Sequence, residues 1–488
     1  MRDNGNGTQP FCRTTECDAP RPPLRILITN VGILCRTGTE IVAMDLARGL
    51  ARAGHSPMIW APQVLPSIVA GVVAEGIPVV TRLEDPPAPP DVIHGHHHME
   101  TVAALRHFPG TPAIFVIHSG AAWYDAPPRH GAIRRYVAVD EFCRERMDDA
   151  PWADPHRVSI ILNAVDMRRF RPRPPLPARP RRALIFSNYA GEDTHREPVE
   201  RACRDLGIAI DSAGSGVGRQ SATPEALLPG YDLVFAKARC AIEAMSVGCA
   251  VVLCDTTGLG EMVTSANVRK LRPWNFGFRC LRRALDPELI AEEILRYNAA
   301  DARAVSGFIG RDAMLESAVE RYVALYRKTL AEGPPPPDEI DRFPPTAPIQ
   351  IDEQSALSLR LAEAPATACM GEHFLTPVVV GNRGAVPLAT SAPWPSLLMY
   401  RWLRRGTGEM AVEHGFRSIL HPPAWPGTES VYRMRIIAPR AAGDYILRAT
   451  IIQEGWRWLD QLDPKVCAEA PVHVLERRSV FAAPQDVR

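Results

Sequence analysis

The sequence lacks any apolar run long enough to cross a membrane. A membrane-spanning helix needs about 20 consecutive apolar residues, and no stretch of this chain reaches ~18. The first 23 residues are polar and have no apolar segment like that of a secretory signal. We therefore expect a disordered tail at 1–23 and no transmembrane segment. Peripheral association with a membrane stays open.

An excess of charge of one sign is also missing. The chain has 56 Lys and Arg against 55 Asp and Glu, so its net charge does not predict a nucleic-acid-binding surface. Its 11 cysteines are odd in number and have no paired metal-site spacing. This cysteine usage is typical of reduced thiols, so we expect a cytoplasmic protein. A location at the inner face of the membrane is compatible with this expectation.

The 488 residues are too many for one hydrophobic core, and the chain divides by pattern into three domains. Strands and helices alternate from 24 to about 330, which predicts two Rossmann-like α/β domains facing a cleft. After 349 the pattern has period two, with Gly and Pro turns, which predicts an all-β sandwich. The expected ranges are a tail at 1–23, α/β domains at 24–170 and 171–330, a Pro-rich linker at 331–349, a β-sandwich at 350–478 and a tail at 479–488.

The segment from Lys237 to Glu243 carries the clearest chemistry. A predicted strand at 233–235 runs directly into a predicted helix, with Lys237 and Arg239 in the first turn and Glu243 one turn further on. Ligands bind at this edge of a doubly wound sheet, and a helix N-terminus attracts anions. Two cations there suit a pyrophosphate, and Glu243 suits a ribose diol. The alternative is a basic surface turn with a solvated Glu.

The same segment resembles the donor site of retaining GT-B glycosyltransferases of the family-4-like type (glycosyl transferases group 1). Glu243-Ala-Met-Ser-Val-Gly-Cys-Ala-Val-Val matches the second half of that family's donor motif, and Asp255 to Glu261 matches the strand and loop that follow. The resemblance implies that Glu243 binds the nucleotide ribose and that Gly258 and Leu259 contact the donor. Phe235 stands where the family has its first Glu. Retention of configuration at the anomeric carbon, and the way in which the sugar ring is held, are therefore left open.

Two further strings agree with this resemblance. Gly38-Thr39-Glu40 with the following helix resembles the family's Gly-rich loop, which closes against donor phosphates. Asn163-Ala-Val-Asp166-x-x-x-Phe170 resembles its signature at the domain junction, for which we expect a structural role.

The strand-end histidines are candidates for the acceptor side. His118 ends a predicted strand, and the resemblance implies that it faces the transferred sugar, where a neutral imidazole can hydrogen-bond a hydroxyl. His94 and His96 belong to a His-Gly-His-His-His run. Adjacent histidines cannot easily converge on one ion, and no Cys or carboxylate is spaced for zinc, so we expect no metal. Two interpretations of His94 and His96 stay open: they line the acceptor side of the cleft, or they are loop residues without a role in binding.

After the first strand of the second domain, the chain departs from the family. The family has an Arg and a Lys there to hold the diphosphate, whereas this chain has Ser187-Asn188 and, later, Arg196. Asn188 and Arg196 are therefore candidate donor ligands, and Lys237 and Arg239 are candidates to supply the missing charge.

The region 355–475 resembles a β-sandwich module appended to bacterial surface-polysaccharide proteins, which implies contact with a glycan. Together these features predict a hexosyltransferase that uses a UDP- or GDP-linked sugar and needs no cofactor. The acceptor would be a glycan or a lipid-linked oligosaccharide in surface-polysaccharide synthesis. A non-catalytic GT-B protein that binds glycan, or a nucleotide-sugar epimerase, are the alternatives.

Overall fold

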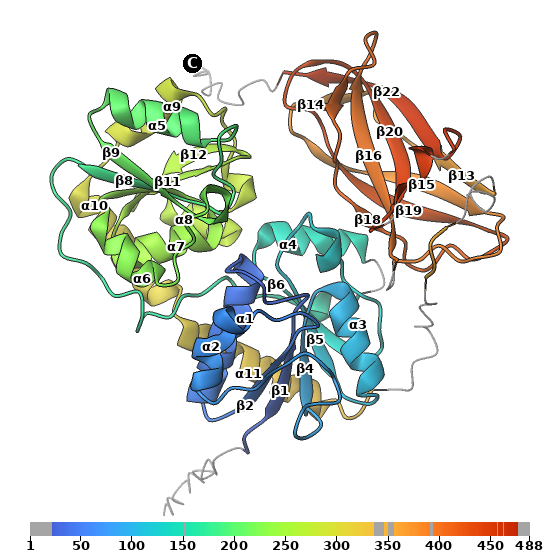
Figure 1. Cartoon of the computed structure of the whole chain (residues 1–488), viewed down its shortest axis with the longest axis horizontal. Helices are drawn as coiled ribbons and strands as arrows, with labels where there is room; N and C mark the ends of the chain where they lie inside the picture. The colour runs from blue at the N-terminus through green and yellow to red at the C-terminus, as the bar shows by residue number, and fades with distance from the viewer. Residues whose placement is uncertain are drawn as a thin grey trace, which may run out of the picture.

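The computed structural model describes residues 22–150, 153–335, 346–349, 356–390, 394–455, 457–461 and 463–476. Within these residues the chain forms two α/β domains and one all-β domain (Figure 1). The predicted fold class is confirmed. Residues 1–21 of the predicted tail at 1–23, the whole of the predicted tail at 479–488 and most of the predicted linker lie outside the described residues.

The first domain is a seven-stranded sheet in the order β3-β2-β1-β4-β5-β6-β7, with every pair parallel. The five inner strands are almost entirely buried, as strands of a parallel sheet covered on both faces are, and the two edge strands are half-buried. Its strands are β1 (Arg25–Thr29), β2 (Ser56–Trp60), β3 (Val79–Val80), β4 (Val92–His96), β5 (Ala113–Ile117), β6 (Ile133–Ala138) and β7 (Val158–Ile160). Its helices are α1 (Gly38–Arg52), α2 (Pro66–Ala74), α3 (His98–His107) and α4 (Glu141–Glu145).

The second domain is a five-stranded sheet in the order β12-β11-β10-β8-β9, with only β12 antiparallel. Asp286 caps α9, its side chain accepting from the amides of Glu288 and Leu289, as the Asp-Pro pair predicts. The strands are β8 (Arg182–Phe186), β9 (Ala209–Ala213), β10 (Leu233–Ala236), β11 (Ala250–Asp255) and β12 (Gly258–Met262). The helices are α5 (Arg196–Asp205), α6 (Pro224–Leu227), α7 (Ala238–Val247), α8 (Val268–Leu271), α9 (Pro287–Leu295) and α10 (Ala299–Asp312).

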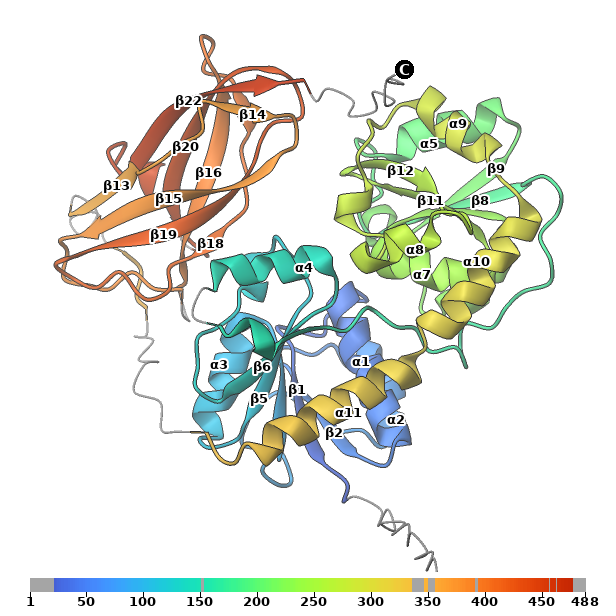
Figure 2. The same ribbon diagram turned by 180° about the vertical axis from the view of Figure 1, so that it is seen from behind.

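The last α/β helix, α11 (Leu315–Ala331), returns to the first domain (Figure 2). Its apolar face, formed by Leu315, Val319, Tyr322 and Tyr326, lies in the same core as β1, β4 and β5. The sequence placed 171–330 in one domain, but the structure packs this helix against β5, β6 and α1. The chain therefore crosses between the α/β domains twice, once after β7 and once before α11.

The C-terminal domain consists of two sheets that share one core. Tyr400 and Trp402 are buried in that core, so they are not surface platforms for sugar rings. One sheet has the order β13-β15-β19 and the other β14-β22-β20-β16-β17, with β18 paired to β16 and β21 to β20. The strands are β13 (Leu357–Leu361), β14 (Thr367–Cys369), β15 (His373–Asn382), β16 (Ser396–Arg404), β17 (Met410–Val412), β18 (Ser418–Ile419), β19 (Thr428–Ile437), β20 (Gly443–Gln453), β21 (Arg457–Trp458) and β22 (Cys467–Leu475).

All three domains meet at one aromatic contact. Phe142 of the first domain stacks on Phe278 of the second, with ring centroids 5.6 Å apart. His373 of the all-β domain meets both rings edge-on, at 5.6 Å and 5.2 Å. The all-β domain is thus packed against the two α/β domains at the side where α4 lies (Figure 1).

Candidate functional site

A cavity lies between the two α/β domains, where the loop after β1 meets the start of α7. Its volume is about 80 Å³. Four of the sequence-predicted donor ligands line it: Gly38, Asn188, Arg239 and Glu243. Three of them come from the second domain and Gly38 comes from the first. The cavity is smaller than the ~300–1,000 Å³ of typical ligand pockets.

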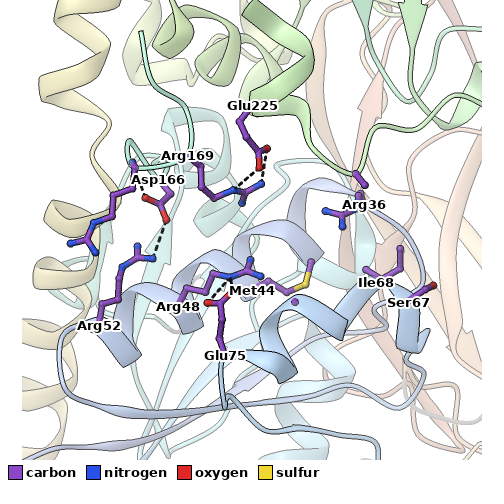
Figure 3. A pocket seen from close by; sticks show the side chains of 13 residues that line it. Arg36, Met44, Arg48, Arg52, Ser67, Ile68, Glu75, Asp166, Arg169 and Glu225 are labelled. Atoms are coloured by element: carbon purple, nitrogen blue, oxygen red, sulfur yellow. Dashed lines mark hydrogen bonds and ion pairs between the residues drawn. The ribbon is translucent and has the colours of Figure 1, made fainter.

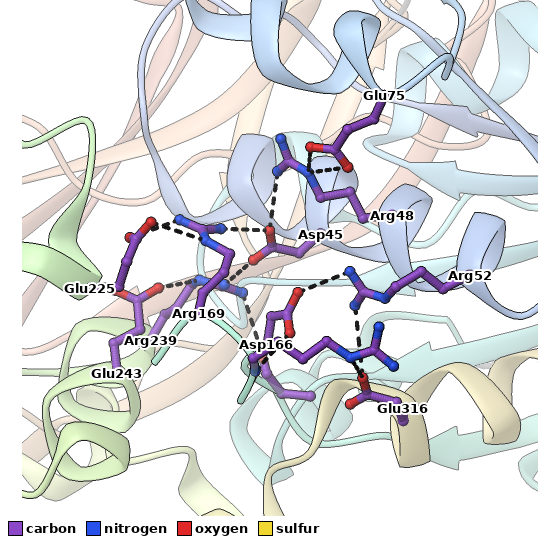
Figure 4. A network of polar contacts seen from close by, with 12 residues as sticks. Asp45, Arg48, Arg52, Glu75, Asp166, Arg169, Glu225, Arg239, Glu243 and Glu316 are labelled. Carbon is purple, nitrogen blue, oxygen red and sulfur yellow. Dashed lines mark hydrogen bonds and ion pairs between the residues drawn. The ribbon is translucent and has the colours of Figure 1, made fainter. Parts of the chain in front are cut away.

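Glu243 lies inside a buried ion-pair network that joins the domains (Figure 4). Arg239 Nε donates to Glu243 Oε1 at 2.8 Å, and Arg239 Nη2 pairs with Asp45 of α1. Glu243 is 3% exposed and Asp45 2% exposed. Burial raises the pKa of Glu243, and the Arg239 guanidinium opposes that rise. The carboxylate predicted to hold the ribose is therefore held in place by Arg239.

Arg169 extends this network toward α6. Its guanidinium donates to Asp45 at 3.1 Å and to Glu225 at 2.9 Å. Arg48 lies 3.5 Å from Asp45 and 2.8 Å from Glu75. Three guanidinium groups thus meet the four carboxylates of Asp45, Glu75, Glu225 and Glu243. The network holds no surplus positive charge for a phosphate.

The cations predicted to bind phosphate already have carboxylate partners. Lys237 pairs with the buried Asp255 of β11, and its ammonium lies 5.0 Å from the centre of the Tyr189 ring. Arg196 donates to Glu200 at 2.5 Å on its own helix. Neither Lys237 nor Arg196 lines the interdomain cavity. The structure thus places only Arg239 of these three at the cleft.

Gly258 and Leu259 form the start of β12 and lie inside the second domain. Leu259 is fully buried and exchanges backbone hydrogen bonds with Arg283 at 3.0 Å and 2.9 Å. A Cβ at Gly258 would lie 2.9 Å from the Arg283 carbonyl oxygen. Neither residue lines the cavity, because the chain forms a hairpin here where the resemblance implied a donor-binding loop.

The β1–α1 loop is held by the side chain of Glu40. Its carboxylate accepts from the amides of Leu34 at 2.9 Å, Cys35 at 3.2 Å and Thr37 at 2.8 Å. Thr37 and Glu40 form a capping box at the start of α1. These three amides are therefore engaged, and the cavity is lined in this loop by Arg36 and Gly38. Thr39 is half-buried and lines neither cavity described here.

A second cavity of about 450 Å³ adjoins the first along α1 (Figure 3). The two share Arg36, Met44, Arg48 and Arg169 as lining residues. Arg52, which pairs with Asp166 at 3.0 Å, closes the far end. Asp166 and Phe170 of the junction string are both buried, which fits the structural role expected for that string.

The predicted acceptor-side histidines form a buried chain at the carboxyl ends of β4 and β5. His94 Nδ1 lies 2.6 Å from the Tyr326 hydroxyl oxygen, and His94 Nε2 lies 2.9 Å from His96 Nε2. The His96 and His118 rings meet edge-on with centroids 4.3 Å apart. His94 and His96 are fully buried and His118 is half-buried, and none of the three lines either of the two cavities.

These histidines are neutral at pH 7. Burial lowers the pKa of His94 to about 3, and it places those of His96 and His118 well below the usual value. A neutral His118 can donate a hydrogen bond to a hydroxyl oxygen or accept one from a hydroxyl, which is the chemistry expected of it. It cannot supply a positive charge to a departing phosphate.

Sequence reasoning missed Asp45, Arg36 and Arg169. Asp45 carried a weak signal, because it is a charged residue between Met44 and Leu46 on the buried side of α1. Arg169 lies inside the junction string but at one of its variable positions. Arg36 precedes the Gly-rich loop, where no pattern marks it.

Among the described residues, no group of three or more His, Cys, Asp or Glu side chains is arranged to hold a metal ion. In the same residues no helix combines the length and the apolar character needed to cross a membrane. The nine cysteines that the structure describes are all free thiols.

No protein-family model and no curated protein matches the chain. Among solved structures, it is similar to a glycosyltransferase from Rickettsia africae ESF-5, at 14% identity and a TM-score of 0.44, covering 64% of this chain and 99% of that one. It is similar to the pneumococcal O-GlcNAc transferase GtfA, solved with UDP and GlcNAc, at 8% identity and a TM-score of 0.42, covering 64% and 100%. WaaG, a glycosyltransferase involved in lipopolysaccharide biosynthesis, matches at 11% identity and a TM-score of 0.37, covering 62% and 99%. Identities and scores of this size carry no conclusion about what the present chain binds.

Proposed function

We propose that the chain is a glycosyltransferase that transfers a hexosyl unit from a UDP- or GDP-linked sugar to a glycan or lipid-linked acceptor. The observation that carries the proposal is the interdomain cavity lined by Gly38, Asn188, Arg239 and Glu243. These residues come from the carboxyl edges of two Rossmann-like sheets, where such folds bind nucleotides. We place the reaction in the cytoplasm, at the inner face of the membrane when the acceptor is lipid-linked.

The ribose is held by Glu243 when the domains open. Its carboxylate sits one turn into α7, directly beside the cavity, and a ribose diol offers it two hydroxyl donors. Arg239 fixes the carboxylate by the 2.8 Å hydrogen bond and opposes the rise in its pKa that burial causes. A carboxylate held in this way loses little entropy when the nucleotide binds.

The transfer step needs no covalent intermediate. The bond between the anomeric carbon and the β-phosphate oxygen breaks, and its electron pair stays on the phosphate. The acceptor hydroxyl oxygen forms the new bond, and its proton passes to the departing diphosphate on the same face of the sugar. This path retains configuration and relies on positioning and electrostatics. His118 is neutral and hydrogen-bonds a hydroxyl of the transferred sugar.

The acceptor lies on the side of the first domain, near the all-β domain. Trp123, next to the loop after β5, packs against Leu397, Met399 and Ile452 of that domain. The all-β domain therefore borders the edge of the sheet that carries His118, and we propose that it helps to bind a surface-polysaccharide acceptor.

The test is nucleotide release from a panel of UDP- and GDP-sugars, with and without a lipid-linked acceptor. We expect release of UDP or GDP that depends on acceptor. Glu243→Gln should lower kcat/KM about 10- to 100-fold, because hydrogen bonds to a charged group contribute about 1.5–3 kcal/mol. Glu292→Gln is the matched control, because Glu292 is exposed and pairs with Arg283 outside the cavity. Interconversion of the donor sugars without transfer would instead indicate an epimerase.

One observation favours a second candidate, a glycan-binding protein without turnover. Phe235 lies within β10 and is fully buried, so the position of the family's first Glu offers no carboxylate to the sugar ring. This candidate predicts tight binding of a nucleotide sugar and no release with any acceptor in the panel.

A further inference from the structure

The charge that meets the donor diphosphate has to come from a residue outside the sequence-predicted set. Lys237 pairs with Asp255, Arg196 pairs with Glu200, and Arg239 pairs with both Asp45 and Glu243. Each of these cations is neutralised by a carboxylate within its own contact shell. A diphosphate that approached them would compete with a protein carboxylate at every one.

Arg36 is the exception among the cations around the cleft. It lines both cavities, and Figure 3 shows its side chain among those that line the larger one. In the part of the chain that the structure describes, its guanidinium makes no ion pair or hydrogen bond. The other arginines of the larger cavity, Arg48, Arg52, Arg168 and Arg169, each pair with at least one carboxylate.

The backbone of Arg36 is held firmly, although its side chain is not. The Asn188 side-chain amide of the second domain donates to the Arg36 carbonyl oxygen at 3.2 Å. On either side of Arg36, the amides of Cys35 and Thr37 donate to the Glu40 carboxylate. The loop therefore presents the Arg36 side chain to the cavity from a fixed point. The same Glu40 contacts leave those amides unable to bind phosphate.

We propose that Arg36 binds the diphosphate of the nucleotide sugar, from the domain opposite to the one that holds the ribose. This inference rests on the proposed function. The planar guanidinium matches two phosphate oxygens at once and stays charged at any working pH. It also stabilises the charge that develops on the β-phosphate as the sugar leaves. With Glu243 on one domain and Arg36 on the other, the donor itself bridges the cleft.

The test compares the binding of UDP, GDP, uridine and guanosine by calorimetry. The variants are Arg36→Gln and Arg36→Lys, with Arg168→Gln as the control. Arg168 lines the same cavity but is 64% exposed and pairs with Glu316. We expect Arg36→Gln to weaken the better-bound diphosphate about 10- to 100-fold and to leave nucleoside binding unchanged. Arg36→Lys should recover part of the loss, and Arg168→Gln should change the affinity less than about twofold.

The outcomes separate the two proposals. If the unaltered chain binds neither UDP nor GDP, the proposed function itself fails. If it binds one of them and Arg36→Gln binds it equally well, only the role of Arg36 is overturned. Equal losses in Arg36→Gln and Arg168→Gln would also overturn it, because the effect would then be one of general charge. Because the Arg36 side chain makes no ion pair or hydrogen bond in the described residues, thermal unfolding of Arg36→Gln should closely match that of the unaltered chain.

Discussion

Asp45→Asn removes the carboxylate that joins the two α/β domains at the cleft. Asp45 is 2% exposed and accepts from Arg239 and Arg169, with Arg48 3.5 Å away. Loss of one member of a buried ion pair costs about 3–5 kcal/mol. Arg239 keeps its 2.8 Å hydrogen bond to Glu243, so we expect the lower end, about 3 kcal/mol. For domains of this size, that corresponds to a Tm lower by roughly 6–12 °C.

The same substitution should tighten donor binding. The cavity of about 80 Å³ cannot admit a nucleotide while Asp45 and Arg239 hold the domains together. A ligand that binds only the open form has its affinity reduced by the fraction of open molecules. Weakening the contact between the domains raises that fraction, and removing a carboxylate from the wall also favours an anion. We expect UDP or GDP to bind about tenfold more tightly to Asp45→Asn.

Two measurements check this pair of effects, thermal unfolding and calorimetric titration with UDP and GDP. Glu75→Gln is the control, because Glu75 contacts Arg48 at the outer end of the network and is half exposed. It should leave both quantities nearly unchanged. An Asp45→Asn variant that is destabilised but binds the nucleotide more weakly would refute the idea that this ion pair opposes donor entry. An unchanged Tm would refute the claim that this buried ion pair stabilises the folded chain.

Three further predictions concern stability. Gly49→Ala should destabilise the chain by about 1–3 kcal/mol, since the new Cβ would lie 2.6 Å from Val319 Cγ2 where α1 meets α11. Tyr326→Phe should cost about 1–3 kcal/mol, because it leaves the buried His94 Nδ1 without its 2.6 Å partner. Burial raises the pKa of Asp125 to about 8, so the folded chain keeps that proton while the unfolded chain loses it near its ordinary pKa. The contribution of Asp125 to the free energy of unfolding is full at low pH and is lost as pH rises toward 8. The free energy of unfolding of Asp125→Asn should therefore increase relative to that of the parent by up to ~1.4 kcal/mol per pH unit over that range.

Urea unfolding measures all three. Gly49→Ser should be at least as destabilising as Gly49→Ala, and an unaffected Gly49→Ala would mean that α11 does not pack closely on α1. A Tyr326→Phe variant as stable as the parent would mean that the hydroxyl is not needed by His94. For Asp125→Asn, a stability difference from the parent that stays constant between pH 5 and 8 would contradict a raised pKa in the folded state.

Much of the fold followed from local pattern. The apolar runs at β1, β4 and β5 are typical of buried parallel strands, and the switch to period two after 349 predicted the all-β domain. Both patterns are set by the backbone geometry of the element itself, which repeats within a few residues. The helical spacing of the apolar residues of α11 likewise indicates one buried face, but it does not indicate which domain that face covers.

The candidate site was likewise predicted only in part. The position of Glu243, one turn into α7, followed from the strand–helix transition and from the motif around it. Whether Lys237 and Arg239 are available to a phosphate depended on Asp255 and Asp45.

Local sequence patterns therefore predict the elements, their order and the edge of the sheet where a nucleotide would bind. Which charges are neutralised at that edge depends on the packing of distant segments. Asp45 and Arg239 are 194 residues apart, and His94 and Tyr326 are 232 apart. Such pairs form only when separate domains or distant elements pack together, and no periodicity within one segment records them. That pairing left Arg36, which no motif marked, as the cation facing the cleft.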